Sequence, residues 1–381
     1  MGAFIFQPMI SKLHFKKIWV IFFFTKVFYL LFAITVYSKL TTLGDTFDYL
    51  NASLNFSFKV LYSSTPMMQF LGSLLKKILK IDVIACLPFM LLAFYGIYYA
   101  VEQLNIYRYA APILILFSLP NFGVWTSILG KEAVGCFSLS VVAVVIIKRL
   151  EGKYPLKAIH YLAFYLCFVF KPQYLIFILQ TLVFLWITRR FADKRYFPLF
   201  FGAIIIALNV LALYLLRDYI DAIAKGMAIH FRSNDPGLAQ STRSEVPWLV
   251  PYGIFKSAPY GMFIAFFGPT LSEMLRKPTQ LLAGIESLTM FGFFGLLVIP
   301  KLRYNLSFFR FNPRVFICCF IIFAGILFIH YPFGFLNPGS AIRYRSNFYP
   351  LFVFMVLYLF TNKGNSDTLS QGLLISGSHK G

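Results

Sequence analysis

Long apolar segments recur along almost the whole chain, and only short polar stretches separate them. A helix needs about 20 apolar residues to cross roughly 30 Å of hydrocarbon, and runs of this kind recur from Trp19 to Phe360. Hydrophobic residues make up 59% of the 381 residues, which is far outside the range of soluble domains. The sequence therefore predicts an all-α, polytopic transmembrane helix bundle. It forms a single integral membrane domain over residues 1–361, followed by a short polar, disordered tail over 362–381.

The formal net charge of +21 narrows the choice of partners. The Lys and Arg residues are dispersed in short loops instead of being gathered on one soluble segment. This pattern argues against nucleic acid and favours anionic membrane lipid. The five cysteines lie inside apolar runs, where Cys behaves as a small hydrophobic residue. We therefore expect no disulfide framework, no metal site and no cofactor.

Apolar runs and the residues that break them predict ten transmembrane helices. They cover about residues 17–38, 82–101, 109–128, 133–149, 157–171, 172–188, 196–216, 281–300, 314–332 and 347–361. With the N-terminus inside, the densest short basic loops lie on the cytoplasmic side, as the positive-inside rule requires. These loops are 148–153, 189–195 and 301–314. Two large outer loops then cover about 39–81 and 217–280, and most acidic residues fall on this side.

Two segments leave the number of spans open. Counting 257–276 as a span would move the basic loop at 301–314 to the outside, so we predict a re-entrant or surface-lying element over 247–277. Residues 59–80 have apolar residues at helical spacing and a basic end, which predicts an amphipathic helix on the outer surface. If that segment spans instead, the topology of the middle of the chain inverts.

The first outer loop carries two candidate catalytic residues. Asp45 and Asp48 follow Gly44 soon after the first span, and carboxylates three residues apart lie on one side of a helical turn. A carboxylate at the membrane edge can have its pKa raised enough to act as a general base. Alternatively, Asp45 caps a short helix. The two roles are compatible, because a helix N-terminus also binds anions.

Charged residues also occupy two sharp outer turns. Lys131 and Glu132 lie in a short loop between two predicted spans, where charges are costly unless they pair or face water. A tight turn would direct both side chains into one vestibule, so we predict Glu132 as a catalytic residue and Lys131 as a substrate ligand. The alternative is a local ion pair at the interface. Lys171 precedes Pro172 and is a further ligand, unless it only extends its ammonium group to the interface.

The segment before the last span holds the strongest candidates. Arg343, Tyr344 and Arg345 lie in a loop shaped by Gly and Pro that can hold both guanidinium groups close to a phosphate, and Arg suits bidentate phosphate recognition. His330 lies upstream, where histidine is more often an interface residue than a catalyst. Four further residues are predicted to bind substrate or to pair with these cations: His230, Arg232, Arg243 and Glu286.

Cations and carboxylates at the outer membrane edge suit a substrate that is half lipid and half phosphate. Transfer of a sugar from a polyprenyl phosphate or pyrophosphate needs a base that activates the acceptor hydroxyl and positive charge that stabilises the departing phosphate. The predicted carboxylates could supply the base. The predicted lysines and arginines could supply the charge without a metal.

Four short motifs together resemble a family of membrane enzymes. They are Gly-Asp-x-x-x-Tyr-Leu at 44–50, Lys-Glu at 131–132, Lys-Pro at 171–172 and Arg-Tyr-Arg at 343–345. Their layout resembles that of bacterial Wzy-type O-antigen polymerases and the related C-type membrane glycosyltransferases, and it covers most of the chain. The resemblance implies a multi-pass protein of the bacterial inner membrane with a periplasmic-face site. It also implies that Asp45 and Asp48 act in the first loop and that Arg343 and Arg345 engage the lipid-linked donor. The chain departs from the family in having Lys171 where an Arg is expected.

Three functions are therefore expected, and we rank them by how well the sequence supports each. The first is a polymerase that joins undecaprenyl-pyrophosphate-linked repeat units of O-antigen or capsule, with a chain-length regulator protein as a partner. The second is a glycosyltransferase that uses a polyprenyl-monophosphate sugar donor. The third is a flippase or transporter for the same lipid-linked saccharide. It ranks last because no inverted repeat is evident and the charges gather at one face instead of the midplane.

Overall fold

The described residues of this chain form helices and no strands. The computed structural model describes residues 12–152, 154–194, 196–233, 243, 247–304 and 312–361. Within these ranges, seven helices are long and apolar enough to cross a membrane. The chain is thus an all-α, multi-pass membrane protein. The predicted tail at 362–381 lies outside the described residues.

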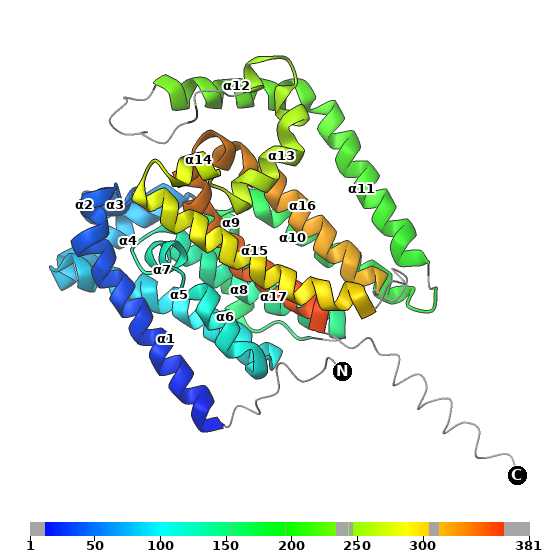
Figure 1. Ribbon diagram of the computed structural model, residues 1–381, viewed down its shortest axis with the longest axis horizontal. Coiled ribbons are helices and arrows are strands. Elements are labelled where there is room, and N and C mark those ends of the chain that lie inside the picture. Colours follow the sequence, from blue (N-terminus) through cyan, green and yellow to red (C-terminus); the bar gives the residue numbers. More distant parts are fainter. Residues whose placement is uncertain are drawn as a thin grey trace, which may run out of the picture.

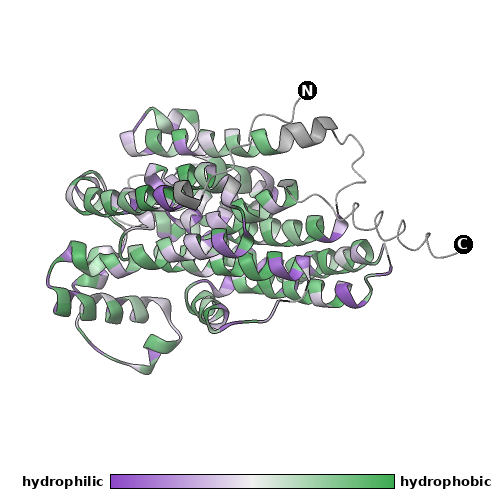
Figure 2. Cartoon of the chain, turned by 90° about the horizontal axis from the view of Figure 1, so that it is seen from below, coloured by the Kyte–Doolittle hydropathy of each residue, from purple (hydrophilic) through white to green (hydrophobic). Residues whose placement is uncertain are grey.

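The seven long helices coincide with seven of the predicted spans. They are α1 (Lys12–Phe32) with its continuation η1 (Ala33–Tyr37) and α2 (Ser38–Leu40), α5 (Asp82–Leu104), α8 (Lys131–Glu151), α10 (Pro172–Arg190), α11 (Phe197–Leu215), α15 (Pro278–Tyr304) and α16 (Pro313–Leu336). In Figure 1, α1 and α11 lie along opposite edges of the molecule. Figure 2 shows that hydrophobic residues dominate the helices. These apolar surfaces suit contact with lipid.

Two of the other predicted spans are shorter or broken. Residues 109–128 form η3 (Tyr107–Tyr109), α6 (Ala110–Phe117) and α7 (Pro120–Trp125). The helix is interrupted before Pro120 because proline cannot donate the backbone hydrogen bond that continues a helix. Residues 157–171 form α9 (Ala158–Phe170), whose 13 residues extend only about 20 Å. The prediction of one unbroken helix over 109–128 is therefore wrong, whereas α9 occupies the residues predicted for the helix at 157–171 and is shorter than the seven long helices.

The last predicted span, 347–361, is the second half of a longer helix. Helix α17 (Pro338–Thr361) begins at Pro338, which suits a first helical position. The side chain of Asn337 accepts hydrogen bonds from the N–H groups of Gly339 (2.8 Å) and Ser340 (3.2 Å), as an N-cap does. The prediction that Arg343 lies in a loop is therefore wrong, because the helix starts five residues earlier.

The segments predicted as the two large outer loops are built from shorter elements. The predicted surface helix at 59–80 corresponds to η2 (Phe58–Leu61) and α4 (Ser64–Leu79). The segment at 247–277 contains η4 (Pro247–Leu249), α13 (Gly253–Phe267) and α14 (Leu271–Met274). With 16 and 15 residues, α4 and α13 extend about 24 and 22 Å, which is less than the hydrocarbon thickness. The remaining elements of these two segments are α3 (Thr46–Leu50) and α12 (Arg217–Ser233).

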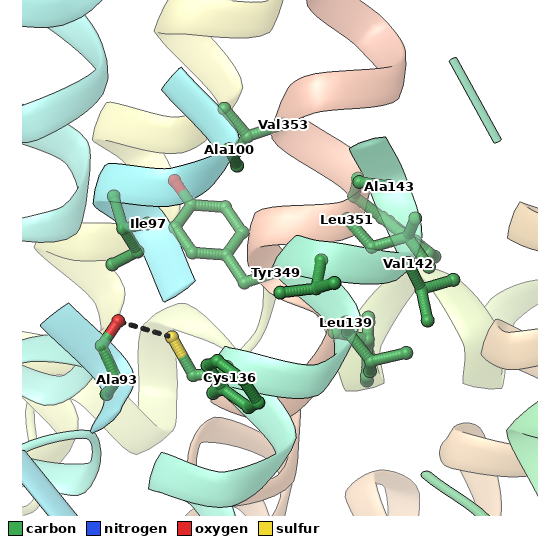
Figure 3. Close-up of a cluster of buried hydrophobic side chains, with 14 of the residues drawn as sticks. Ala93, Ile97, Ala100, Cys136, Leu139, Val142, Ala143, Tyr349, Leu351 and Val353 are labelled. Atoms are coloured by element: carbon green, nitrogen blue, oxygen red, sulfur yellow. Dashed lines mark hydrogen bonds between the residues drawn. The ribbon is translucent and has the colours of Figure 1, made fainter. Parts of the chain in front are cut away.

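Helix α8 occupies the centre of the bundle, where it packs against α5, α9 and α17. All its residues from Glu132 to Ile147 are buried. Figure 3 shows side chains of α5, α8 and α17 packed together, with Cys136 donating to the carbonyl of Ala93. An added Cβ on Gly96 of α5 would lie 2.6 Å from the Cα of Phe137, so the two backbones are in close contact. This packing fixes the position of the α8 N-terminus.

Candidate functional site

Arg343 on α17 connects the segment between α2 and α3 to the start of α8. Its Nη2 donates to Asp45 Oδ2 (3.1 Å) and its Nε donates to Glu132 Oε1 (2.8 Å). Asp45 Oδ2 also accepts a hydrogen bond from the Tyr49 hydroxyl (2.9 Å). Three of the four sequence motifs therefore meet at one guanidinium group. We call Asp45, Glu132 and Arg343 the carboxylate–arginine network.

Gly44 makes this contact sterically possible. Its φ of +57° lies in the left-handed region, which glycine adopts without strain. An added Cβ at this position would lie 2.3 Å from Nη1 of Arg343. Position 44 therefore needs glycine both for its backbone and for the space that the guanidinium group occupies.

The two carboxylates of the network differ in exposure. The side chain of Glu132 is 1% exposed, whereas that of Asp45 is 48% exposed. Glu132 also lies in the first turn of α8, where the helix dipole favours a negative charge. Glu132 is thus the buried partner that holds Arg343, and Asp45 is the carboxylate that solvent can reach.

Asp45 is neither a side-chain cap nor a carboxylate of raised pKa. It occupies the N-cap position of α3, but its side chain makes no capping hydrogen bond. Burial alone would raise its pKa, but the charge of Arg343 and the hydrogen bonds from Arg343 and Tyr49 outweigh burial and lower the pKa. The predicted N-cap position of Asp45 is thus found, without the capping hydrogen bond, and the predicted rise in its pKa is wrong. Because the folded pKa of Asp45 lies below the unfolded one, the stabilisation from this contact is fully present above the unfolded pKa. It is lost as the pH falls through the folded pKa.

Asp48 lies one turn further along, on α3. Its side chain is exposed, and no hydrogen bond or ion pair joins it to another residue in the described part of the chain. The two carboxylates that the sequence grouped together thus occupy different environments. Only Asp45 belongs to the network.

A cavity of about 160 Å³ lies beside the network. Lys131 and Lys171 line it together with Tyr174, His330 and Tyr344. The remaining lining residues are Ser64, Phe170, Gln173, Ile329 and Phe333. The cavity thus lies between the start of α4, the start of α8, the turn between α9 and α10, the end of α16 and the start of α17.

The two lysines have no carboxylate partner within the described ranges. Lys171 is only 7% exposed, and its ammonium group lies over the rings of Tyr174 (5.8 Å) and Tyr344 (5.1 Å). Lys131 donates to the hydroxyl of Thr65 (2.7 Å). Neutral partners and aromatic rings orient an ammonium group without cancelling its charge. The cavity is therefore positively charged and suited to an anion.

A break between two helices places Lys171 in this position. Pro172 begins α10, and Lys171 has φ −143° and ψ 53°, so its backbone leaves the helical conformation. Its N–H still donates to the carbonyl of Cys167 in the last turn of α9 (2.8 Å). The Lys-Pro step thus turns the chain sharply and directs the lysine inward.

Arg345 belongs to a second, fully buried ion pair. It donates to Glu286 (3.1 Å), to the Ser287 hydroxyl (2.8 Å) and to the carbonyl of Phe266 (2.6 Å). Both charged side chains are 2% exposed. Residues two apart on a helix point about 200° apart, so Arg345 faces away from the network that holds Arg343. The prediction that both arginines face one phosphate is therefore wrong.

Glu286 completes this pair by joining α15 to α7. Its Oε2 accepts the backbone N–H of Asn121 (2.9 Å) in the first turn of α7. The predicted pairing of Glu286 with one of the cations is thus found, with Arg345 as the partner. No residue that lines the cavity takes part in the Arg345–Glu286 pair. The pair connects α15 to α17 and α7.

The other predicted residues lie outside the network. Arg243 forms two contacts with Glu273 (2.6 and 3.0 Å) and also donates to the carbonyl of Phe335 (2.6 Å), so it ties its segment to α16. Burial would raise the pKa of Glu273, but the hydrogen bonds from Arg243 and Thr270 lower it. His230 lies on α12 at the edge of the molecule (Figure 1). The side chain of Arg232 lies outside the described residues.

Two residues of the site, Thr65 and Tyr174, had no clear signal in the sequence. They orient the two lysines, whereas Tyr49, which orients Asp45, belongs to the first of the four motifs. His330 is buried and lines the cavity, and its Nε2 lies 3.2 Å from the carbonyl of Ala265. The aromatic rings could have been noticed beside the charged motifs. Thr65 could not, because it lies 66 positions from Lys131.

The described residues contain no group of three or more His, Cys, Asp or Glu that could hold a metal ion. No protein-family model, curated protein or solved structure matches this chain.

Proposed function

We propose that this protein is a membrane-embedded glycosyltransferase acting on an oligosaccharide linked to undecaprenyl pyrophosphate. The observation that carries this proposal is the cavity, in which Lys131 and Lys171 present ammonium groups without a carboxylate partner among the described residues. A phosphate group supplies the missing negative charge. The lipid tail of such a substrate suits the apolar surface of the helices.

The size of the cavity limits which part of the substrate it can hold. Its volume of about 160 Å³ is close to that of a cavity of about 150 Å³ that holds one benzene molecule. This space suits a phosphate group and is too small for an oligosaccharide. The saccharide would therefore extend outward from the cavity, past the half-exposed Asp45.

In glycosyl transfer, the network would supply the base and the cavity would stabilise the charge of the leaving phosphate. The acceptor hydroxyl attacks the anomeric carbon, the bond from that carbon to the phosphate oxygen breaks, and the phosphate leaves with the electron pair. Lys131 and Lys171 stabilise the charge on the leaving phosphate. A carboxylate takes the proton of the hydroxyl, and Asp45 is the accessible member of the network. Its lowered pKa keeps it ionised, so it acts as a weak base that accepts the proton as the bond to the phosphate breaks. Arg343 holds Asp45 and Glu132 in place.

Three further parts of the proposal concern the membrane in which the chain lies, the orientation of the chain and the repetition of the transfer. The chain would lie in the bacterial inner membrane with ten crossings and with the site at the periplasmic face. It would transfer a growing O-antigen or capsule glycan onto an incoming repeat unit, with a chain-length regulator as partner. A transferase with a polyprenyl-monophosphate donor is the second candidate, since the small cavity would also suit a single phosphate. Flipping the same lipid has less support, because both lysines lie at helix ends instead of the midplane.

The surface glycan of a strain that lacks this chain tests the proposal. Loss of a polymerase leaves glycan that is one repeat unit long, because the units are still assembled and exported. A polymer of normal length that lacks one sugar would contradict polymerisation and support the monophosphate-dependent transferase. Complete units trapped on the cytoplasmic side would indicate a flippase instead.

A further inference from the structure

A second, larger cleft lies at the opposite ends of the same helices. Its volume is about 560 Å³, and it lies between α8, α9 and α10. Helices α8 and α10 both begin beside the first cavity, at Lys131 and after Lys171. Arg149 is 18 residues after Lys131 on α8, which corresponds to about 27 Å along the helix at 1.5 Å per residue. The cleft is therefore close to the other face of a hydrocarbon core about 30 Å thick.

Three arginines and an apolar wall line this cleft. Arg149 comes from the end of α8, and Arg189 and Arg190 come from the last turn of α10. The wall includes Phe164 of α9 and Leu182 of α10. The cleft thus combines cations at a helix end with an apolar surface that continues toward the membrane interior.

The positive charge of the cleft has no carboxylate partner in the described part of the chain. The salt bridges there do not involve Arg149, Arg189 or Arg190. Glu151, the acidic residue nearest in sequence to Arg149, pairs with Lys148 (2.9 Å). The positive-inside rule alone accounts for basic residues in loops. It does not account for three arginines that line one apolar cleft.

One of these guanidinium groups is held in place by an aromatic ring. The Cζ of Arg190 lies 4.1 Å from the centre of the Trp186 ring, and Trp186 itself lines the cleft. Tryptophan favours the membrane–water interface, where its ring meets both lipid tails and headgroups. This arrangement suits an arginine at headgroup depth and leaves its N–H groups able to bind an anion.

We propose that this cleft binds an anionic phospholipid of the surrounding bilayer. The headgroup phosphate pairs with Arg149, Arg189 and Arg190, and one acyl chain lies along Phe164 and Leu182. Basic pockets between transmembrane helices bind anionic headgroups in this way. The lipid would fill the space between the far ends of α8 and α10, the two helices whose other ends hold the candidate site.

Native mass spectrometry of the purified full-length protein tests this proposal. The probes are dioleoyl phosphatidylglycerol and dioleoyl phosphatidylcholine, which share their acyl chains and differ in headgroup charge. We expect phosphatidylglycerol to be retained at least about tenfold more tightly. Arg189→Gln should weaken its binding about tenfold, as expected for the loss of one charged hydrogen bond. Leu182→Trp should block the acyl chain while all three arginines remain.

Lys194→Gln is the matched control, because it removes one exposed positive charge from the loop after α10 without touching the cleft. We expect this variant to bind phosphatidylglycerol as the wild type does. Equal retention of the two lipids by the wild type would overturn the proposal, and this comparison needs no variant. Equal losses in Arg189→Gln and Lys194→Gln would show a diffuse charge effect instead of a site. Complete displacement of the lipid by glycerol phosphate would show that the acyl chain contributes nothing.

Discussion

Lys171 should be less favourable for stability than an apolar residue at the same position. The side chain is 7% exposed and has no carboxylate partner within the described ranges, and an unpaired buried charge costs several kcal/mol of folding free energy. The cation–π contacts with the rings of Tyr174 and Tyr344 offset this cost by about 0.5–2 kcal/mol each. Lys171→Met removes the charge and keeps a flexible chain of similar shape. We therefore expect it to raise the free energy of unfolding by about 1–3 kcal/mol.

Thermal unfolding of the purified protein, followed by intrinsic fluorescence, measures this effect. Lys39→Met on α2 is the matched control, because Lys39 is exposed and lies outside the cavity. We expect a higher midpoint for Lys171→Met and no rise for Lys39→Met. A lower midpoint for Lys171→Met would refute the reasoning, because it would mean that the ammonium group is needed by the fold.

Three further predictions concern the surroundings of the cavity. Gly44→Ala should abolish activity while the protein still inserts, because the new methyl group would displace Arg343; in-gel glycan analysis beside a membrane-level blot checks this, and normal glycan would contradict it. Asp45→Asn should lose activity in the same assay whereas Asp48→Asn should keep it, because only Asp45 contacts the network; equal tolerance of both would remove the general-base role. Glu286→Gln leaves its buried arginine partner without a carboxylate and should cost about 3–5 kcal/mol, measured as a lower unfolding midpoint, and an unchanged midpoint would count against it.

The helical, membrane-spanning architecture could be predicted because it depends on local composition. A run of about 20 apolar residues needs no knowledge of its neighbours to indicate a span. Pro120 is a local signal that could have revealed the break between α6 and α7. Asn337 and Pro338 form an N-cap and first-turn pattern that could have placed Arg343 in a helix.

The pairing of charges could not be predicted, because it depends on packing between distant segments. Arg343 contacts Asp45 and Glu132 across 298 and 211 positions of sequence. The sequence placed charged residues at one membrane face, but it did not show which cations are neutralised. In the structure, Arg343 pairs with Asp45 and Glu132, and Arg345 pairs with Glu286. Lys131 and Lys171 remain as the ammonium groups of the cavity.

Binding of undecaprenyl pyrophosphate to the purified protein tests the central claim most directly. Native mass spectrometry of the wild type and of Lys131→Met, Lys171→Met and Lys39→Met gives the affinity without any turnover. We expect the two cavity variants to bind the lipid about 10- to 100-fold more weakly, as for the loss of one charged hydrogen bond to phosphate, and the control Lys39→Met to bind it normally. Equal affinity of all four proteins would contradict the assignment of this cavity to the lipid phosphate.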